Sequence, residues 1–151
     1  MKSEPFVYSI DDLAREKVGE WNGIRNYQVR NLIRDTIKPG DVALFYHSSA
    51  KEIGCAGVME VVGEPYPDPT QFDGKSPYFD SKVTSENPRW LAFKVRFVEK
   101  FAQIVSLTAM RGEPRLAGLR ILERGNRLSI TPVTKQEFED IIKLAKFARA
   151  G

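Results

Sequence analysis

The chain has 151 residues with one cysteine and one histidine, which fits one domain and excludes a disulfide framework or a multi-cysteine zinc site. Apolar residues make up 42% and charged residues 28%, as expected of a folded domain, and no apolar run approaches the roughly 18 residues of a membrane helix. The formal net charge is +3, yet residues 89–151 hold 13 basic and 6 acidic side chains. Such a basic excess can face a phosphate backbone or only solvent.

The first third of the chain predicts one short strand and two helices. Residues 6–8 are apolar and aromatic and predict an opening strand. Ser9, with Asp12 three positions later, predicts a capping box at the start of a helix that runs to about residue 17. Apolar residues recur at helical spacing over residues 26–36, which predicts a second helix.

The middle of the chain predicts three strands and a long loop. Residues 42–46 are almost continuously apolar, which is typical of a strand buried on both faces. Residues 54–64 predict a strand whose three glycines indicate bulges or close backbone approach. Residues 65–88 contain five prolines and predict a stiff loop, which at this length is usually functional. Residues 90–101 alternate with period two, as a strand does.

The remaining segments predict short helical pieces near residues 106–110 and 116–123, and a last short strand at residues 127–130. Residues 134–137 read Thr-Lys-Gln-Glu, a capping box that opens a C-terminal helix. The sum is one domain over residues 1–151, α+β in class, with a mixed, strongly bent sheet and flanking helices.

The residues with catalytic potential do not form a recognisable catalytic motif. His47 and Ser48 are neighbours on a predicted strand and therefore point to opposite faces. No nucleophile elbow, Walker loop or dinucleotide fingerprint occurs, and Cys55 between Gly54 and Ala56 is typical of a small buried side chain. We therefore expect no enzymatic activity, no metal and no cofactor. An acid–base pair is possible only if the fold brings together two of Glu4, Asp68 and Asp73.

Aromatic side chains in loops and at element ends point to a different chemistry. Many of them are interleaved with amide, hydroxyl and arginine side chains. An aromatic face stacks a nucleic-acid base with about 1–3 kcal/mol, and polar groups can then read the edge of that base. Core packing is the alternative for each aromatic residue, and for Trp21 and Tyr66 both interpretations stay open.

Five motifs in order resemble the EVE-domain family, which includes the thymocyte nuclear proteins. They are KSEP at residues 2–5, WNGIRNYQVRN at 21–31, FYHS at 45–48, YPD and QFD within 66–73, and RLSITPV at 127–133. The resemblance implies a PUA-like pseudo-barrel that reads modified bases without catalysis. 5-Methylcytosine and 5-hydroxymethylcytosine in DNA are the usual candidate ligands of the family, and related domains bind modified RNA. Eukaryotic members carry a basic N-terminal extension that this sequence lacks, so we expect a bacterial, cytoplasmic, stand-alone protein that binds no membrane.

The resemblance also implies a set of site residues. Trp21 is expected to stack on the base and Asn26 to bind its edge. The full predicted base pocket consists of Trp21, Asn26, Tyr27, Tyr46, Ser48, Tyr66, Asp68, Gln71, Phe72 and Ser129. The residues expected to contact phosphates are Arg25, Arg30 and Arg127, and those expected to border the site are Lys2 and Ser3. The alternative function is an enzyme or small-molecule sensor for a free modified nucleoside or nucleotide, and protein partners are not predicted.

Overall fold

The protein is built on a five-stranded sheet in the order β1-β3-β4-β5-β2. The computed structural model describes the backbone of residues 1–150 and the side chains of residues 1–147. β1 pairs in parallel with β3, and every other neighbouring pair in this sheet is antiparallel. The strands are β1 (Lys2–Ser3), β2 (Val18–Trp21), β3 (Val42–His47), β4 (Gly54–Pro67) and β5 (Leu91–Ser106).

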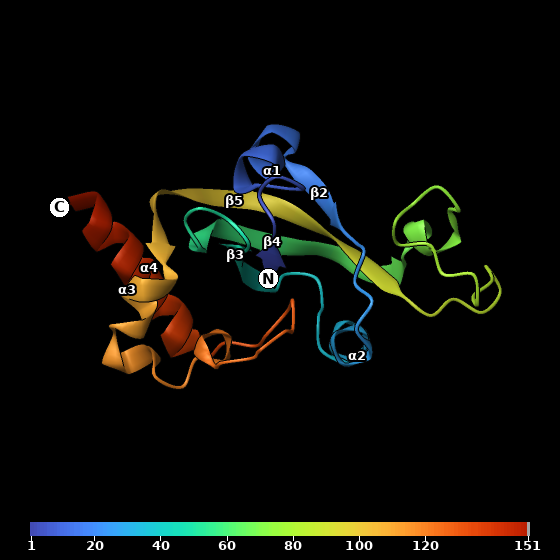
Figure 1. Cartoon of the computed structure of the whole chain (residues 1–151). Helices are drawn as coiled ribbons and strands as arrows, with labels where there is room; N and C mark the ends of the chain where they lie inside the picture. The colour runs from blue at the N-terminus through green and yellow to red at the C-terminus, as the bar shows by residue number, and fades with distance from the viewer. Residues whose placement is uncertain (151) are drawn as a thin grey trace.

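Helices flank the sheet and extend the molecule at one end. They are α1 (Ile10–Glu16), α2 (Tyr27–Asp35), α3 (Leu107–Arg111) and α4 (Lys135–Ala150), with short 3₁₀ turns η1 (Pro69–Phe72), η2 (Pro114–Leu116) and η3 (Arg120–Leu122). Figure 1 shows β4 and β5 running across the molecule, with α3 and α4 at one end and the loop after β4 at the other. The predicted α+β class, a pseudo-barrel made of a mixed, strongly bent sheet with flanking helices, is confirmed. The edge strands β1 and β2 do not pair, so the sheet is not closed.

Short capping motifs in the sequence determine where α1 and α4 begin. The side chain of Ser9 accepts from the N–H of Asp12, and the Asp12 carboxylate accepts from the N–H of Ser9, so the predicted capping box is present. Thr134 and Glu137 make the same reciprocal pair at the start of α4. These contacts occupy backbone donors that a helix N-terminus otherwise leaves unpaired.

The glycines of β4 allow the sheet to bend tightly. A Cβ on Gly54 would stand 2.2 Å from the carbonyl oxygen of Val105, and one on Gly57 would stand 2.2 Å from that of Glu99. The pairing register between β4 and β5 shifts at three places along these strands. Bulges increase local twist, so the predicted close backbone approach is confirmed and explains the curvature.

Two apolar clusters fill the two sides of the sheet. One contains Phe45, Met59 and Phe93 with side chains of α1 and α2. The other contains Leu44 and Val58 with side chains of α3 and α4. Because neighbouring residues of β3 belong to different clusters, the strand is buried on both faces, as its apolar run predicts.

Two predicted strands are wrong, and two observed strands, β1 and β2, were not predicted. β1 consists of only two residues and exists through its pairing with β3. Residues 6–8 form a turn, because the N–H groups of Val7 and Tyr8 both donate to the carbonyl of Glu4. Residues 127–130 form no strand and include a bend at Ser129. A bond from the N–H of Lys2 to the carbonyl of Ser129 links them to β1, which is too little for a ladder. β2 is only four residues long and exists through its pairing with β5, a long-range contact that local sequence cannot show.

The buried side chain of His47 makes the stability of this packing dependent on pH, which can be measured. Its imidazole is buried, and Nε2 accepts a hydrogen bond of 3.1 Å from the N–H of Ile10 at the start of α1. Burial lowers the pKa of His47 below its ordinary value of 6.5, an effect larger than those of nearby Asp11 and Lys100. The imidazole of His47 is therefore harder to protonate in the folded protein than in the unfolded chain. The free energy of unfolding falls as the pH drops below 6.5, and the fall ends below the pKa of the folded state.

We expect His47→Gln, which keeps an acceptor, to flatten this pH dependence. Urea unfolding at pH 7.5 and pH 5 measures it, and the quantity of interest is the difference between the wild type and the variant. The buried N-terminal amine, whose pKa is lowered to about 6, titrates in both proteins and cancels from that difference. An equal loss of stability in both proteins would contradict the assigned role of His47.

Candidate functional site

A cleft of about 600 Å³ opens where segments far apart in the sequence meet. Its walls come from β1 and the turn after it, the connection between β2 and α2, the residue after β3, the loop after β4, and residues 127–129. Backbone hydrogen bonds join three of these segments. The N–H of Ser48 donates to the carbonyl of Ser3 at 2.9 Å, and that of Lys2 donates to the carbonyl of Ser129 at 2.8 Å.

The wall between β2 and α2 is held by a buried carboxylate. The side chain of Asp68 is fully buried, and it accepts from the N–H of Gly23 at 2.8 Å, the N–H of Thr70 at 2.8 Å and the guanidinium of Arg25 at 3.0 Å. Burial alone would raise the pKa of Asp68, but the hydrogen bonds outweigh it and hold the pKa below its ordinary value. Asp68 therefore stays charged at neutral pH and ties the loop after β4 to the cleft wall.

Tyr78 forms one rim of the cleft, and it is not among the predicted site residues. Arg25 donates to the carbonyl of Tyr78 from Nε at 3.0 Å and from Nη2 at 2.7 Å. Gly23 has φ +76°, and a Cβ there would stand 2.8 Å from the Tyr78 ring, so only glycine permits this contact. The sequence signal for Tyr78 is an aromatic pair directly after Pro77 in the proline-rich loop.

Trp21 lies in the core as well as in the cleft wall. Its side chain is only 7% exposed and packs edge-to-face against Phe45, with ring centroids 5.3 Å apart. A ring this deeply buried presents a small part of its surface to the cleft, so the predicted face-on stacking of a base on Trp21 is not available in this conformation.

Of the predicted site residues, eight meet in the cleft: Lys2, Ser3, Trp21, Arg25, Asn26, Ser48, Arg127 and Ser129. Asn26 caps α2, because its Oδ1 accepts from the N–H of Val29 at 3.0 Å. The amide nitrogen of Asn26 is therefore the part of that side chain suited to a ligand. The guanidinium of Arg25 donates hydrogen bonds to Asp68, Thr70 and the carbonyls of Ile24 and Tyr78. These bonds hold the cleft wall together, so the role of Arg25 is structural.

Of four further predicted pocket residues, three hold the structure around the cleft and one lies outside it. Gln71 is fully buried and bonds to the backbone of Asp68, Arg89 and Trp90. Tyr66 donates its hydroxyl to Glu20, which itself lines the cleft. Asp68 holds the wall from behind, and Phe72 lies in η1, 37% exposed and outside the cleft lining.

The remaining predicted residues lie elsewhere. Tyr27 is 51% exposed on α2, and its ring packs 4.8 Å from Trp90. Arg30 lies over the Tyr27 ring at 5.1 Å and donates to the carbonyl of Arg89. Tyr46 is buried beside a second cavity. These residues were predicted to belong to the site because they lie within the motifs that carry the family resemblance, but helix and strand geometry turns them away from the cleft.

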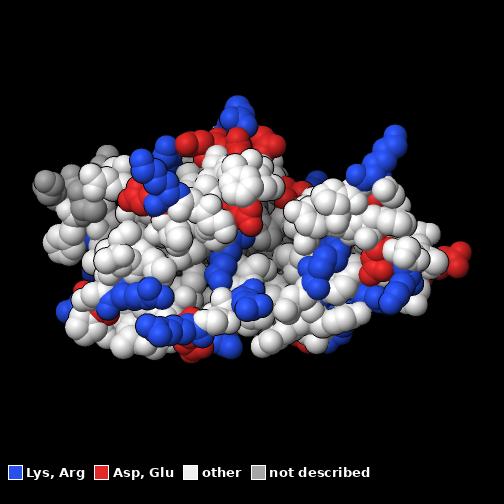
Figure 2. Space-filling model, in the orientation of Figure 1, with Lys and Arg blue, Asp and Glu red and all other residues white. Residues whose placement is uncertain are grey.

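The charge of the cleft is mixed. Lys2 and Arg127 line it, and Nζ of Lys2 donates to the carbonyl of Asn126 at 3.2 Å. Glu4 and Glu20 line it as well. Figure 2 shows basic side chains spread over the lower half of the face drawn, acidic ones concentrated over α1, and a hollow between α1 and the lobe formed by the loop after β4. One rim of the hollow is thus suited to anions and the other is not.

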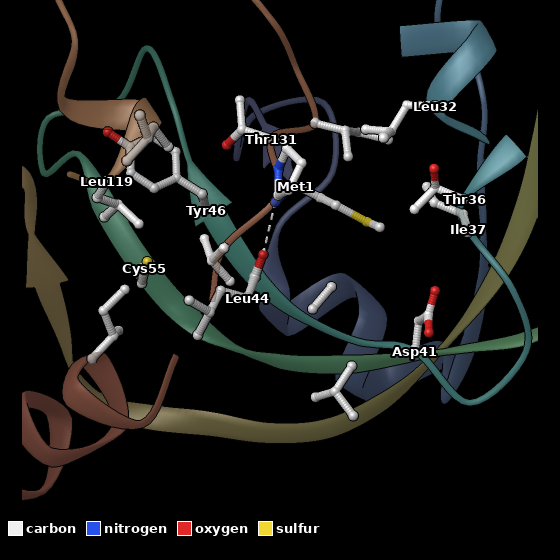
Figure 3. Close-up of a pocket in the computed structure, with 17 residues that line it drawn as sticks. Met1, Leu32, Thr36, Ile37, Asp41, Leu44, Tyr46, Cys55, Leu119 and Thr131 are labelled. Carbon is white, nitrogen blue, oxygen red and sulfur yellow. Dashed lines mark hydrogen bonds between the residues drawn. The ribbon is translucent and has the colours of Figure 1, made fainter. Parts of the chain in front are cut away.

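A second cavity of about 230 Å³ lies behind β1 and is lined mainly by apolar side chains (Figure 3). The amine of Met1 donates to the carbonyl of Leu44 at 3.0 Å, and the Met1 side chain extends toward Ile37. Cys55 also lines the cavity, and burial raises the pKa of its thiol to about 12. This thiol is protonated at neutral pH, so it cannot act as a thiolate nucleophile there.

Among the residues that the structure describes, no group of three or more histidine, cysteine, aspartate or glutamate side chains is arranged to hold a metal ion. Within the same residues, each helix is too short or too polar to cross a membrane.

Comparison with known proteins places the chain in a family. The model of the EVE domain matches residues 1–144. Thymocyte nuclear protein 1 of Gallus gallus is 39% identical over 95% of this chain and 66% of its own length, and the Homo sapiens protein is 37% identical over 95% of this chain and 72% of its own length. The chain thus spans about two thirds of the chicken relative.

Solved structures agree with this match. A crystal structure of a Pseudomonas syringae protein has a TM-score of 0.92 at 42% identity, covering 96% of this chain and 97% of that one. The human THYN1 protein in complex with 5-methylcytosine-containing DNA has a TM-score of 0.88 at 36% identity, covering 97% of this chain and 95% of that one. On the extent of the family match and the similarity of the folds, the chain belongs to the EVE domain family.

Proposed function

We propose that this protein is a non-catalytic module that binds DNA carrying a modified base such as 5-methylcytosine and takes that base into the cleft. The observation that carries the proposal is the cleft itself, which combines a volume of about 600 Å³ with polar groups and with Lys2 and Arg127 at its edge. Cavities of about 300–1,000 Å³ are typical of specific ligand sites. The human relative with the same fold was solved with 5-methylcytosine-containing DNA.

The groups in the cleft suit the edge of a base. The hydroxyls of Ser48 and Ser129 can donate or accept, the amide nitrogen of Asn26 can donate, and Glu20 can accept from an amino group such as N4 of cytosine. Extruding a base from a duplex costs a few kcal/mol, which these bonds and the apolar contacts must offset. A methyl group adds under about 1 kcal/mol when buried, so preference for the methyl alone is expected to be several-fold.

Arg127 gives a prediction about the DNA backbone. Its side chain is exposed at the cleft edge. We expect Arg127→Ala to weaken binding to modified and unmodified DNA by similar factors and to lower the slope of log K against log[salt] by about 1, because one phosphate contact is lost. Arg124→Ala, exposed three residues away and outside the cleft lining, is the matched control. Loss of discrimination between bases in Arg127→Ala would contradict a backbone role.

Binding titrations test the proposed function. Matched duplex and single-stranded oligonucleotides carry cytosine, 5-methylcytosine, 5-hydroxymethylcytosine or 6-methyladenine, and each is measured at two salt concentrations, alongside the corresponding RNA and free nucleosides. A preference for one modified DNA that survives the higher salt supports the proposal. Equal and salt-sensitive binding to every DNA would reject it. Tighter binding to RNA, or to a free nucleoside, would instead assign the cleft to that ligand.

A further inference from the structure

Two apolar residues project from the turn between β1 and α1, at the rim of the cleft. The side chain of Phe6 is 75% exposed and that of Val7 is 62% exposed, and Val7 lines the cleft. A single exposed apolar residue is ordinary, but two adjacent ones at the mouth of a candidate ligand site indicate a contact surface.

The turn is held rigidly on both sides. The N–H groups of Val7 and Tyr8 donate to the carbonyl of Glu4, each at 2.9 Å, and the hydroxyl of Ser3 donates to the carbonyl of Tyr8 at 2.6 Å. The capping box of Ser9 follows at once. Binding through Phe6 therefore requires little ordering of the backbone, since the conformation exists before the partner arrives.

The charges around the turn select the chemistry of its partner. Glu4 lies two residues before Phe6 and lines the cleft, as Lys2 and Arg127 do. Asp11 and Asp12 in the first turn of α1 form ion pairs with Lys100 at 2.7 Å and Arg15 at 2.6 Å. The turn itself thus offers no positive charge to a phosphate, and Glu4 repels one, so it is poorly suited to the DNA backbone. Its exposed apolar side chains suit the uncharged faces of stacked bases.

We propose that Phe6, supported by Val7, acts as a wedge that enters the base stack at the place left by the base in the cleft. Apolar side chains inserted between base steps are a general means of stabilising an unstacked duplex. The phenyl ring replaces the stacking that the neighbouring bases lose, so Phe6 favours the opened duplex over the closed one. This inference rests on the proposed function, since it requires a base in the cleft.

The test compares DNA in which the base must leave a stack with DNA in which it need not. Wild type, Phe6→Ala, Phe6→Leu and the control Phe147→Ala are titrated with three forms of one 5-methylcytosine site: a duplex, a single strand, and a duplex with an abasic site opposite the modified base. Phe147 is 72% exposed on α4, so its loss matches that of Phe6 in size and exposure.

We expect Phe6→Ala to lose at least about fivefold in affinity for the duplex, with less loss for the abasic duplex and under twofold for the single strand. Phe6→Leu retains most of the affinity, and Phe147→Ala retains all of it. Unchanged duplex binding by Phe6→Ala, or equal loss for duplex and single strand, would overturn the wedge while leaving the proposed function intact. A wild type that prefers none of the modified DNAs in the titrations above would overturn both.

Discussion

Asp68→Ala is expected to lower the free energy of unfolding by about 3–5 kcal/mol, the range for breaking a buried ion pair. The substitution leaves the guanidinium of Arg25 and the N–H groups of Gly23 and Thr70 without their acceptor. Domains of this kind are stable by about 5–15 kcal/mol, so the loss is a large fraction of the total. Chemical denaturation followed by circular dichroism measures it.

The same substitution should also open the cleft wall. Asp68 links Gly23 and Arg25 to the loop that carries Tyr78, so hydrogen exchange in residues 69–79 should increase in Asp68→Ala. Glu86→Ala, exposed later in the same loop, is the control and should stay within about 0.5 kcal/mol of wild type. A variant that unfolds like the control would show that the Asp68 network does not hold the loop.

Trp21→Ala should be comparably destabilising, by about 3–5 kcal/mol, because a large buried aromatic leaves a cavity that its neighbours cannot fill. Trp21 contacts Phe45 edge-to-face and lies opposite Phe93 in the pairing of β2 with β5. Loss of DNA binding in this variant would therefore report unfolding as much as a missing contact. Thermal unfolding of Trp21→Ala, compared with that of Trp21→Phe, distinguishes loss of the fold from loss of a ligand contact.

The Phe variant keeps an aromatic ring in the core and removes the indole at the cleft. We expect Trp21→Phe to retain most of the stability, and its DNA affinity then reports the part of Trp21 that faces the ligand. If Trp21→Ala unfolds at the same temperature as wild type, the side chain contributes little to the core and its burial has been misinterpreted.

The helices were predictable because their signals are local. The Ser9 and Thr134 capping boxes and the apolar spacing of α2 each lie within one short window. The strands were predictable where they are long and apolar, as β3, β4 and β5 are. β2 contains a glycine and a glutamate in four residues and depends on β5, so no local pattern marks it.

The candidate site was only partly predictable, because a polar side chain can be present either to bind a ligand or to satisfy buried backbone groups. Asp68 and Gln71 satisfy buried backbone groups: neither side chain has exposed surface, and both make their hydrogen bonds within the protein. Sequence alone does not show burial, so both were assigned to the pocket. Ser48, Asn26 and Ser129 meet in the cleft through long-range pairing, which only the family resemblance anticipated.

The most direct test of the account asks where the modified base binds. ¹⁵N-labelled protein is titrated with a duplex containing one 5-methylcytosine and, separately, with the unmodified duplex, and the two sets of amide shift changes are subtracted. The account predicts that the difference concentrates at the residues that line the cleft, namely 2–4, 7, 8, 20–26, 48, 78, 127 and 129. A difference confined to the cavity behind β1, around Leu119 and Ile141, or spread evenly over basic surface residues, would contradict it.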